Sequence, residues 1–144
     1  MKPPGWYIDG PNKSLKSEYI GPTTLAILDG CLLGDGSYVQ RSGHTASFSL
    51  SQCAAHAEWV EDLHAFLHKH QVTSTLSRGV YRRKNREFAY VKLWTHSLVD
   101  LLPQRARWYP NGKKIIPADL DLSNSTTLAH WHMGDGNTVV ARGR

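Results

Sequence analysis

The sequence has 144 residues, a length that fits one domain or slightly more than one. Hydrophobic residues make up 40% of it, including five Trp and six Tyr, which is enough for a core and excludes a wholly disordered chain. Its apolar runs are too short to span a membrane, two cysteines are too few for a disulfide scaffold, and the net charge is +5.

The N-terminal residues lack the apolar segment of a secretory signal. Together with the low cysteine content, this predicts a protein of the cytoplasm or of an organelle, with no membrane partner.

The basic residues are concentrated in one stretch of the chain. Residues 72–116 contain ten Lys or Arg and two acidic residues, so this window carries a net charge of +8 and the remainder is acidic. Such a window favours a polyanionic partner, with nucleic acid as the natural candidate. The alternative is a solvated surface on a basic protein.

The first third of the chain predicts an arm, a helix and two strands. Residues 1–22 are rich in Pro, Gly, Lys and Ser and form a loose arm. A helix over residues 24–34 begins at a cap from Thr23 or Thr24 and ends in Gly-Asp-Gly. A short strand covers residues 37–41.

The strand that follows, over residues 44–52, alternates between apolar and polar side chains. Ala46, Phe48 and Leu50 face one side, and small hydroxyl residues face the other. This pattern predicts a half-buried strand with an open polar face.

A helix over residues 54–70 carries one apolar stripe and an acidic outer face. Two strands follow, over residues 73–82 and 87–95, joined by a basic turn. One face of the second strand is basic and aromatic, which is typical of a sheet that reads a nucleic-acid groove; the alternative is an ordinary exposed face. That face consists of Arg86, Phe88, Tyr90, Lys92 and Trp94.

The last third predicts two helices. A short helix over residues 96–102 is expected to end at Pro103, followed by a turn over residues 108–112. A final helix begins with a cap from Ser123, Ser125 or Thr126. The expected fold class is therefore α+β, with antiparallel hairpins between helices.

One pattern occurs twice in the chain. Residues 28–36 and 128–136 are apolar helical segments that end in Gly-Asp-Gly, and their aspartates, Asp35 and Asp135, are 100 residues apart. Small residues such as Gly30 allow two helix backbones to approach closely. A carboxylate is disfavoured at the negative end of a helix unless a cation offsets it. Two such ends side by side would form a hard-oxygen site suited to Mg²⁺.

These two segments resemble the motifs of the LAGLIDADG homing endonuclease family. The first motif, residues 25–37, is the closer match, whereas His130 and His132 replace small or apolar residues in the second. Residues 108–120 are similar to a segment that precedes the second motif in one branch of the family. The resemblance covers residues 23–137.

The resemblance implies an αββαββα unit with a curved antiparallel sheet that lies in the major groove of double-stranded DNA. It implies metal-dependent phosphodiester hydrolysis with Mg²⁺ or another divalent cation. The implied metal ligands are Asp35, Asp135, Gly34 and Gly134. Gln52 is expected to order the water network, and Lys113 or Lys114, with Lys113 preferred, to supply a nearby cation.

The resemblance also implies that polar side chains on the open strand faces contact DNA. Arg is the expected guanine reader, Gln and Ser are versatile, and other side chains contact phosphate only. The expected contacts are Tyr38, Gln40, Arg41, Ser47, Ser49, Arg78, Arg82, Arg83, Arg86, Tyr90 and Lys92.

The resemblance also implies a domain order. An arm over residues 1–22 precedes the αββαββα unit over 23–107 and a linker over 108–124. Residues 125–144 are expected to form the second motif helix and the start of a missing or truncated second unit. A two-motif enzyme has a second αββαββα unit after this helix, so we expect half of such an enzyme, completed in trans by a second unit or as a dimer.

Two other functions stay open. One is a non-catalytic nucleic-acid binder, such as an intron RNA maturase or a DNA-binding remnant. The other is a small-molecule or interaction domain with a basic surface. The eight histidines do not indicate a structural zinc site, because the pair His64 and His68 lacks a third ligand at a known spacing.

Overall fold

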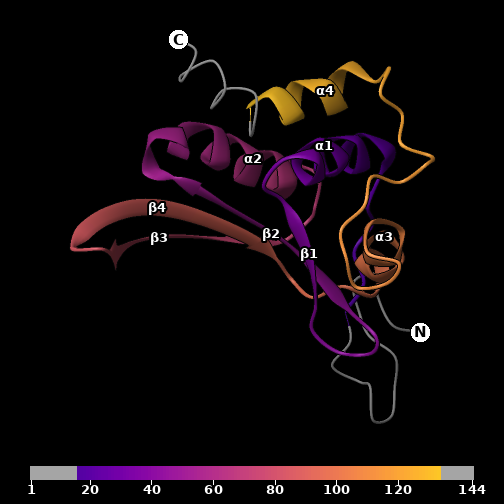
Figure 1. Cartoon of the computed structure of the whole chain (residues 1–144). Coiled ribbons are helices and arrows are strands. Elements are labelled where there is room, and N and C mark those ends of the chain that lie inside the picture. The colour runs from indigo at the N-terminus through magenta and orange to yellow at the C-terminus, as the bar shows by residue number, and fades with distance from the viewer. Residues whose placement is uncertain (1–15, 134–144) are drawn as a thin grey trace.

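The computed structural model describes residues 16–133 of the chain. It shows a curved four-stranded antiparallel sheet in the order β1-β2-β4-β3, with helices on one face, while no described element covers the other face (Figure 1). This arrangement confirms the expected α+β class. The elements are α1 (Pro22–Leu33), β1 (Ser37–Gln40), β2 (Ala46–Cys53), α2 (Ala57–Lys69), β3 (Ser74–Arg83), β4 (Arg86–Thr95), α3 (Leu102–Trp108) and α4 (Ser125–Trp131).

The core lies between the helices and the sheet. The alternation expected for β2 is confirmed, because Ala46, Phe48 and Leu50 are buried against the helices. Leu50 pairs across the sheet with Leu93, which in turn pairs with Leu76 of β3. The expected stripe of α2 is confirmed as well, with its buried members being Trp59, Val60, Leu63 and Leu67.

The start of α1 differs from the expected cap. Gly21 is the N-cap, Pro22 occupies the first turn, and no side chain caps the helix. Proline suits this position because its missing N–H has no partner in the first turn of a helix. Thr24 is buried instead, so the predicted threonine cap was wrong.

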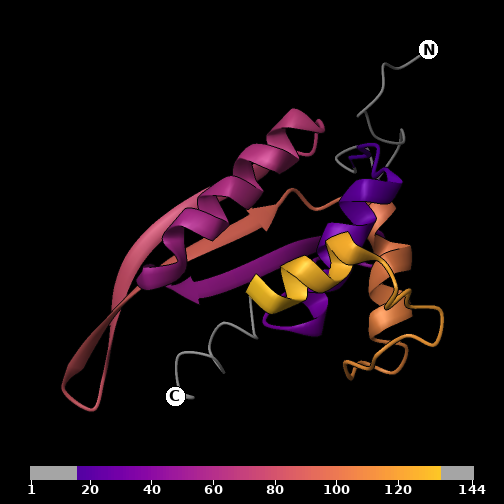
Figure 2. The same ribbon diagram turned by 90° about the horizontal axis from the view of Figure 1, so that it is seen from above.

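Strands β3 and β4 form a long two-stranded ribbon that extends beyond the rest of the sheet (Figures 1 and 2). Lys84 and Asn85 connect them with φ values of 54° and 64°. Two successive positive φ values are typical of the type I′ turn, whose twist matches that of paired strands. The expected basic turn is therefore confirmed.

The region around Pro103 differs most from the prediction. A 3₁₀ turn over Val99–Leu101 leads directly into α3, and Pro103 lies in the first turn of that helix rather than at the end of the preceding one. Proline is tolerated there and not in a helix interior. Trp108, expected in a turn, completes α3 and is fully buried.

The cap of α4 was also predicted wrongly. The side chain of Asn124 accepts hydrogen bonds from the backbone N–H groups of Thr126 and Thr127 at 2.9 and 3.2 Å. Asparagine is among the preferred N-cap residues.

The described end of the expected loose arm is held in place. Lys16 bridges to Leu98, and the hydroxyl of Ser17 donates to Asp100 at 2.6 Å. The carboxylate of Glu18 accepts two hydrogen bonds from Thr73. None of the helices within residues 16–133 is long and apolar enough to cross a membrane.

Candidate functional site

Helices α1 and α4, which carry the two repeated segments, lie side by side (Figures 1 and 2). A Cβ atom added to Gly30 would collide with the backbone carbonyl of Thr127 and would lie 2.9 Å from Cβ of His130. The hydroxyl of Thr127 donates to the carbonyl of Ala26 at 2.9 Å. The close backbone approach expected at Gly30 is therefore confirmed.

Asp29 anchors the middle of α1 to α3, a role that the sequence analysis missed. Its carboxylate accepts from Arg107 Nη1 at 2.8 Å and from the indole N–H of Trp108 at 3.1 Å. Arg107 also donates to Asp119 at 2.7 Å. Burial opposes the charge of Arg107, but its two carboxylate partners raise its pKa overall. The presence of an acidic residue within an otherwise apolar helix could have indicated such a buried contact.

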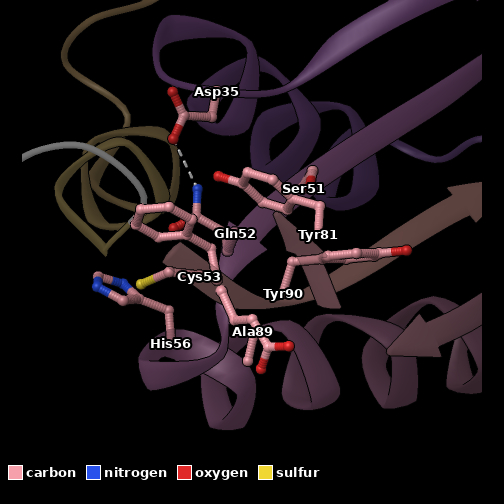
Figure 3. A pocket seen from close by; sticks show the side chains of 10 residues that line it. Asp35, Ser51, Gln52, Cys53, His56, Tyr81, Ala89 and Tyr90 are labelled. Carbon is pink, nitrogen blue, oxygen red and sulfur yellow. Dashed lines mark hydrogen bonds between the residues drawn. The ribbon is translucent and has the colours of Figure 1, made fainter. Parts of the chain in front are cut away.

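Asp35 follows the C-terminal end of α1 and is exposed. Gln52, buried near the end of β2, donates from Nε2 to Oδ2 of Asp35 at 2.8 Å (Figure 3). The turn beyond Asp35 is tight: a Cβ atom on Gly36 would lie 2.8 Å from the carbonyl oxygen of Cys31. Asp35 and Gln52, two site residues that were predicted from the sequence and are 17 positions apart, are therefore in direct contact.

Lys114 lies at the same helix end. Its ammonium group donates to the carbonyl oxygens of Gly34 at 3.1 Å and Gly36 at 2.7 Å. A cation there offsets the partial negative charge of the helix terminus beside Asp35. The contact belongs to Lys114, whereas Lys113, which the sequence analysis preferred, is exposed in the linker.

The described residues fit one half of a site for a hard cation. Asp35 supplies a carboxylate and Gly34 a backbone carbonyl, and oxygen donors of this kind suit Mg²⁺. Within residues 16–133 no group of three or more His, Cys, Asp or Glu side chains is placed to hold a metal. Asp135 and Gly134, the expected second half, lie outside the described residues.

A pocket of about 490 Å³ opens beside Asp35 at the end of β2 (Figure 3). Ser51, Gln52 and His56 line it on the side of β2. The ribbon supplies aromatic side chains, namely Tyr81, Phe88 and Tyr90.

The open face of the ribbon has the composition that the sequence predicted. Register pairs Ser49 and Ser51 of β2 with Trp94 and Lys92, and Arg83 with Arg86. Because paired residues point to the same side of a sheet, all of these share the face opposite the helices. Of the expected DNA contacts, this face carries Ser49, Arg83, Arg86, Tyr90 and Lys92.

Three expected contacts on β1 and β2 are not exposed on the open face. Tyr38 pairs with Phe48 and Gln40 with Ala46, so both point to the helix side. Tyr38 is 3% exposed, and burial raises the pKa of its hydroxyl. Ser47 is 1% exposed, and its hydroxyl donates to the carbonyl of Thr95 at 2.7 Å. The predicted placement of Tyr38 and Gln40 on the open face was wrong, whereas Ser47 has the same orientation as Ser49 but is buried.

Two arginines of β3 also point to the helix side. Arg78 pairs with Val91 and forms an ion pair with Glu61 of α2. Arg82 pairs with Glu87, and their charged groups are 3.7 Å apart. Their predicted placement on the open face was wrong because the pairing register assigns them to the other side. Arg41 follows β1 and is exposed.

Comparisons with known proteins agree with these features. The chain is 30% identical to cytochrome b mRNA maturase bI2 of Debaryomyces hansenii over 135 residues, which cover 89% of this chain and 49% of the maturase. It is also 30% identical over 112 residues to an uncharacterized protein of Methanocaldococcus jannaschii, covering 76% of this chain and 42% of that protein. The chain therefore spans less than half the length of these curated relatives.

The fold matches a solved structure of the homing endonuclease I-WcaI bound to its DNA recognition sequence. The TM-score is 0.68 at 20% sequence identity, covering 81% of this chain and 52% of that one. The sequence pattern of the LAGLIDADG DNA endonuclease family matches residues 25–143, which include both repeated segments. The chain belongs to the LAGLIDADG DNA endonuclease family.

Proposed function

We propose that this chain binds double-stranded DNA and contributes half of a metal-dependent site for phosphodiester hydrolysis. The observation that carries the proposal is the geometry at the end of α1. Asp35 is exposed and oriented by Gln52, and its helix is packed against the helix of the second motif. The family pattern and the fold match to a DNA-bound homing endonuclease support it.

The residues at this end of α1 have distinct roles in the proposed reaction. Asp35 and the Gly34 carbonyl would hold a divalent cation such as Mg²⁺, together with Asp135 and Gly134 of the second motif. When bound, the cation supplies Lewis acidity at the scissile phosphate. Gln52 holds one oxygen of the Asp35 carboxylate, Oδ2, by a hydrogen bond, and the other oxygen would bind the cation. Lys114 places a positive charge at the helix end, where it offsets the partial negative charge of the carbonyl groups beside Asp35.

The open face of the sheet would bind the duplex. A two-stranded ribbon fits the major groove of B-form DNA. Arg83, Arg86 and Lys92 lie on that face of the ribbon and would contact phosphates or base edges. The second unit of the site would come from another protein unit in trans or from a second copy of the chain.

The test is cleavage by the Asp35→Asn variant. Duplexes that the full chain binds are selected from a random library and incubated with Mg²⁺. We expect cleavage to fall at least about a hundredfold in Asp35→Asn, while affinity measured without metal is retained. Asp62→Asn, an exposed carboxylate on α2, is the matched control and should cleave like the wild type. Equal cleavage by both variants would refute the role of Asp35.

A non-catalytic nucleic-acid binder is the second candidate, and the similarity to a cytochrome b mRNA maturase favours it. This function predicts salt-sensitive binding to intron RNA that is unaffected by Asp35→Asn, with no Mg²⁺-dependent cleavage of any selected duplex. The same protein preparations therefore separate the two functions.

A further inference from the structure

Three aromatic side chains form a cluster on the ribbon next to Asp35. The rings of Tyr81 and Phe88 are stacked, with centroids 5.3 Å apart and an angle of 22° between their planes. The ring of Tyr90 lies 6.1 Å from that of Tyr81. Tyr81 is 48% exposed, so part of the stack is open to solvent. A contiguous group of partly exposed rings, unlike a single exposed ring, is a sign of a binding surface.

Gly79 determines the position of the Tyr90 ring. A Cβ atom on Gly79 would collide with the hydroxyl and ring of Tyr90, its cross-strand partner. The ring of Tyr90 therefore lies across the glycine, against the backbone of β3. A side chain at position 79 would push it away from this position.

The cluster forms the aromatic wall of the pocket beside Asp35 (Figure 3). The volume of about 490 Å³ is in the usual range for small-ligand pockets. Ser51, Gln52 and His56 add hydrogen-bonding groups to the lining, which also includes the carboxylates of Asp35 and Glu87. The guanidinium of Arg86 lies 5.6 Å from the ring centre of Phe88, which places a positive charge at the rim.

We infer that this pocket takes the base of an unpaired nucleotide. Bases within an intact duplex present only their edges, because their faces are covered by neighbouring bases. Ring faces on a protein bind base faces, and cations at the rim bind the backbone that carries them. An unpaired nucleotide stacked on Tyr81 places its backbone near Arg86 and beside Asp35. The inference rests on the proposed function only in that the ligand is nucleic acid.

The experiment compares the affinity of the full chain for a labelled DNA duplex and for the same duplex with one unpaired adenine. We expect the second to bind about tenfold more tightly, the usual contribution of stacking one base. A fluorescent adenine analogue at the unpaired position should be quenched on binding. Both effects should disappear in Tyr81→Ala and persist in Tyr81→Phe, which keeps the ring and removes the hydroxyl.

Tyr19→Ala is the control, since Tyr19 is an exposed tyrosine outside the ribbon, and it should keep the preference. Gly79→Ala, which displaces the ring of Tyr90, should weaken the preference without loss of the fold. Equal affinity for both duplexes, or a preference that survives Tyr81→Ala, would overturn the inference and leave the Asp35 cleavage test untouched. A quenched analogue in a chain that cleaves nothing would support the pocket and refute only the endonuclease.

Discussion

The α1–α4 contact and the β3–β4 ribbon each depend on a glycine, but for different reasons. At Gly30 the missing side chain admits the backbone carbonyl of Thr127 from a neighbouring helix. At Gly79 it admits the far end of the Tyr90 side chain, a ring that can rotate away. A backbone carbonyl inside a helix cannot move without moving the helix. Gly30 is therefore required for the packing of the fold, whereas Gly79 determines the position of a surface side chain.

The largest expected effect tests the first half of this comparison. Gly30→Val inserts a branched side chain against Thr127, so we expect the free energy of unfolding to fall by about 3 kcal/mol. Urea denaturation followed by circular dichroism measures it. Gly43→Val is the control, because a Cβ atom at Gly43 has no neighbour within 4 Å, and its change should stay below about 0.5 kcal/mol. Similar losses in the two variants would show that α4 does not pack tightly on α1.

A smaller effect tests the two faces of the ribbon. Lys92 is on the open face, whereas Arg78 is paired with Glu61 on the helix side. Lys92→Ala should weaken binding to duplex DNA severalfold. It should also reduce the slope of log affinity against log salt concentration by about 1, the value for the loss of one phosphate contact. Arg78→Ala should leave both nearly unchanged. Binding isotherms at several salt concentrations measure this, and a larger effect of Arg78→Ala would reverse the assignment of faces.

How far the sequence predicted this molecule depends on whether the relevant contact is local. The stripe of α2 and the alternation of β2 are periodic within a few residues, so they were predictable. The proximity of Asp35 and Gln52 followed from the resemblance to a family. Register across a hairpin is not visible in one strand alone, and a shift of one residue moves every side chain to the other face. Arg78 and Tyr38 were misplaced for this reason.

Two other differences have physical causes outside any local pattern. Pro103 ends a helix or begins one equally well on sequence grounds, and only the packing of buried Trp108 shows that α3 continues beyond it. Asp29 and Arg107 are 78 residues apart, so their ion pair depended on the tertiary fold. Contacts of this kind need the three-dimensional arrangement of α1 and α3.

The smallest expected effect concerns the protonation of His130 in the second motif, which lies against Gly30. It is half-buried, and its Nδ1 accepts from the indole N–H of Trp59 at 3.4 Å, a contact that requires this nitrogen to be unprotonated. Burial lowers the pKa of His130 below its ordinary value. The folded chain therefore binds this proton less readily than the unfolded chain does, and stability falls with decreasing pH.

The stabilisation from neutral His130 is fully present above the ordinary histidine pKa of about 6.5 and is lost as the pH falls through the lowered folded value. Comparing urea denaturation at about pH 7.5 and about pH 5, the wild type should lose more stability than His130→Gln, which cannot titrate. The other histidines are the same in both proteins, so the difference between the two losses isolates His130. Equal losses would show that His130 is not held neutral at the contact, and that the tight packing at Gly30 does not depend on its charge.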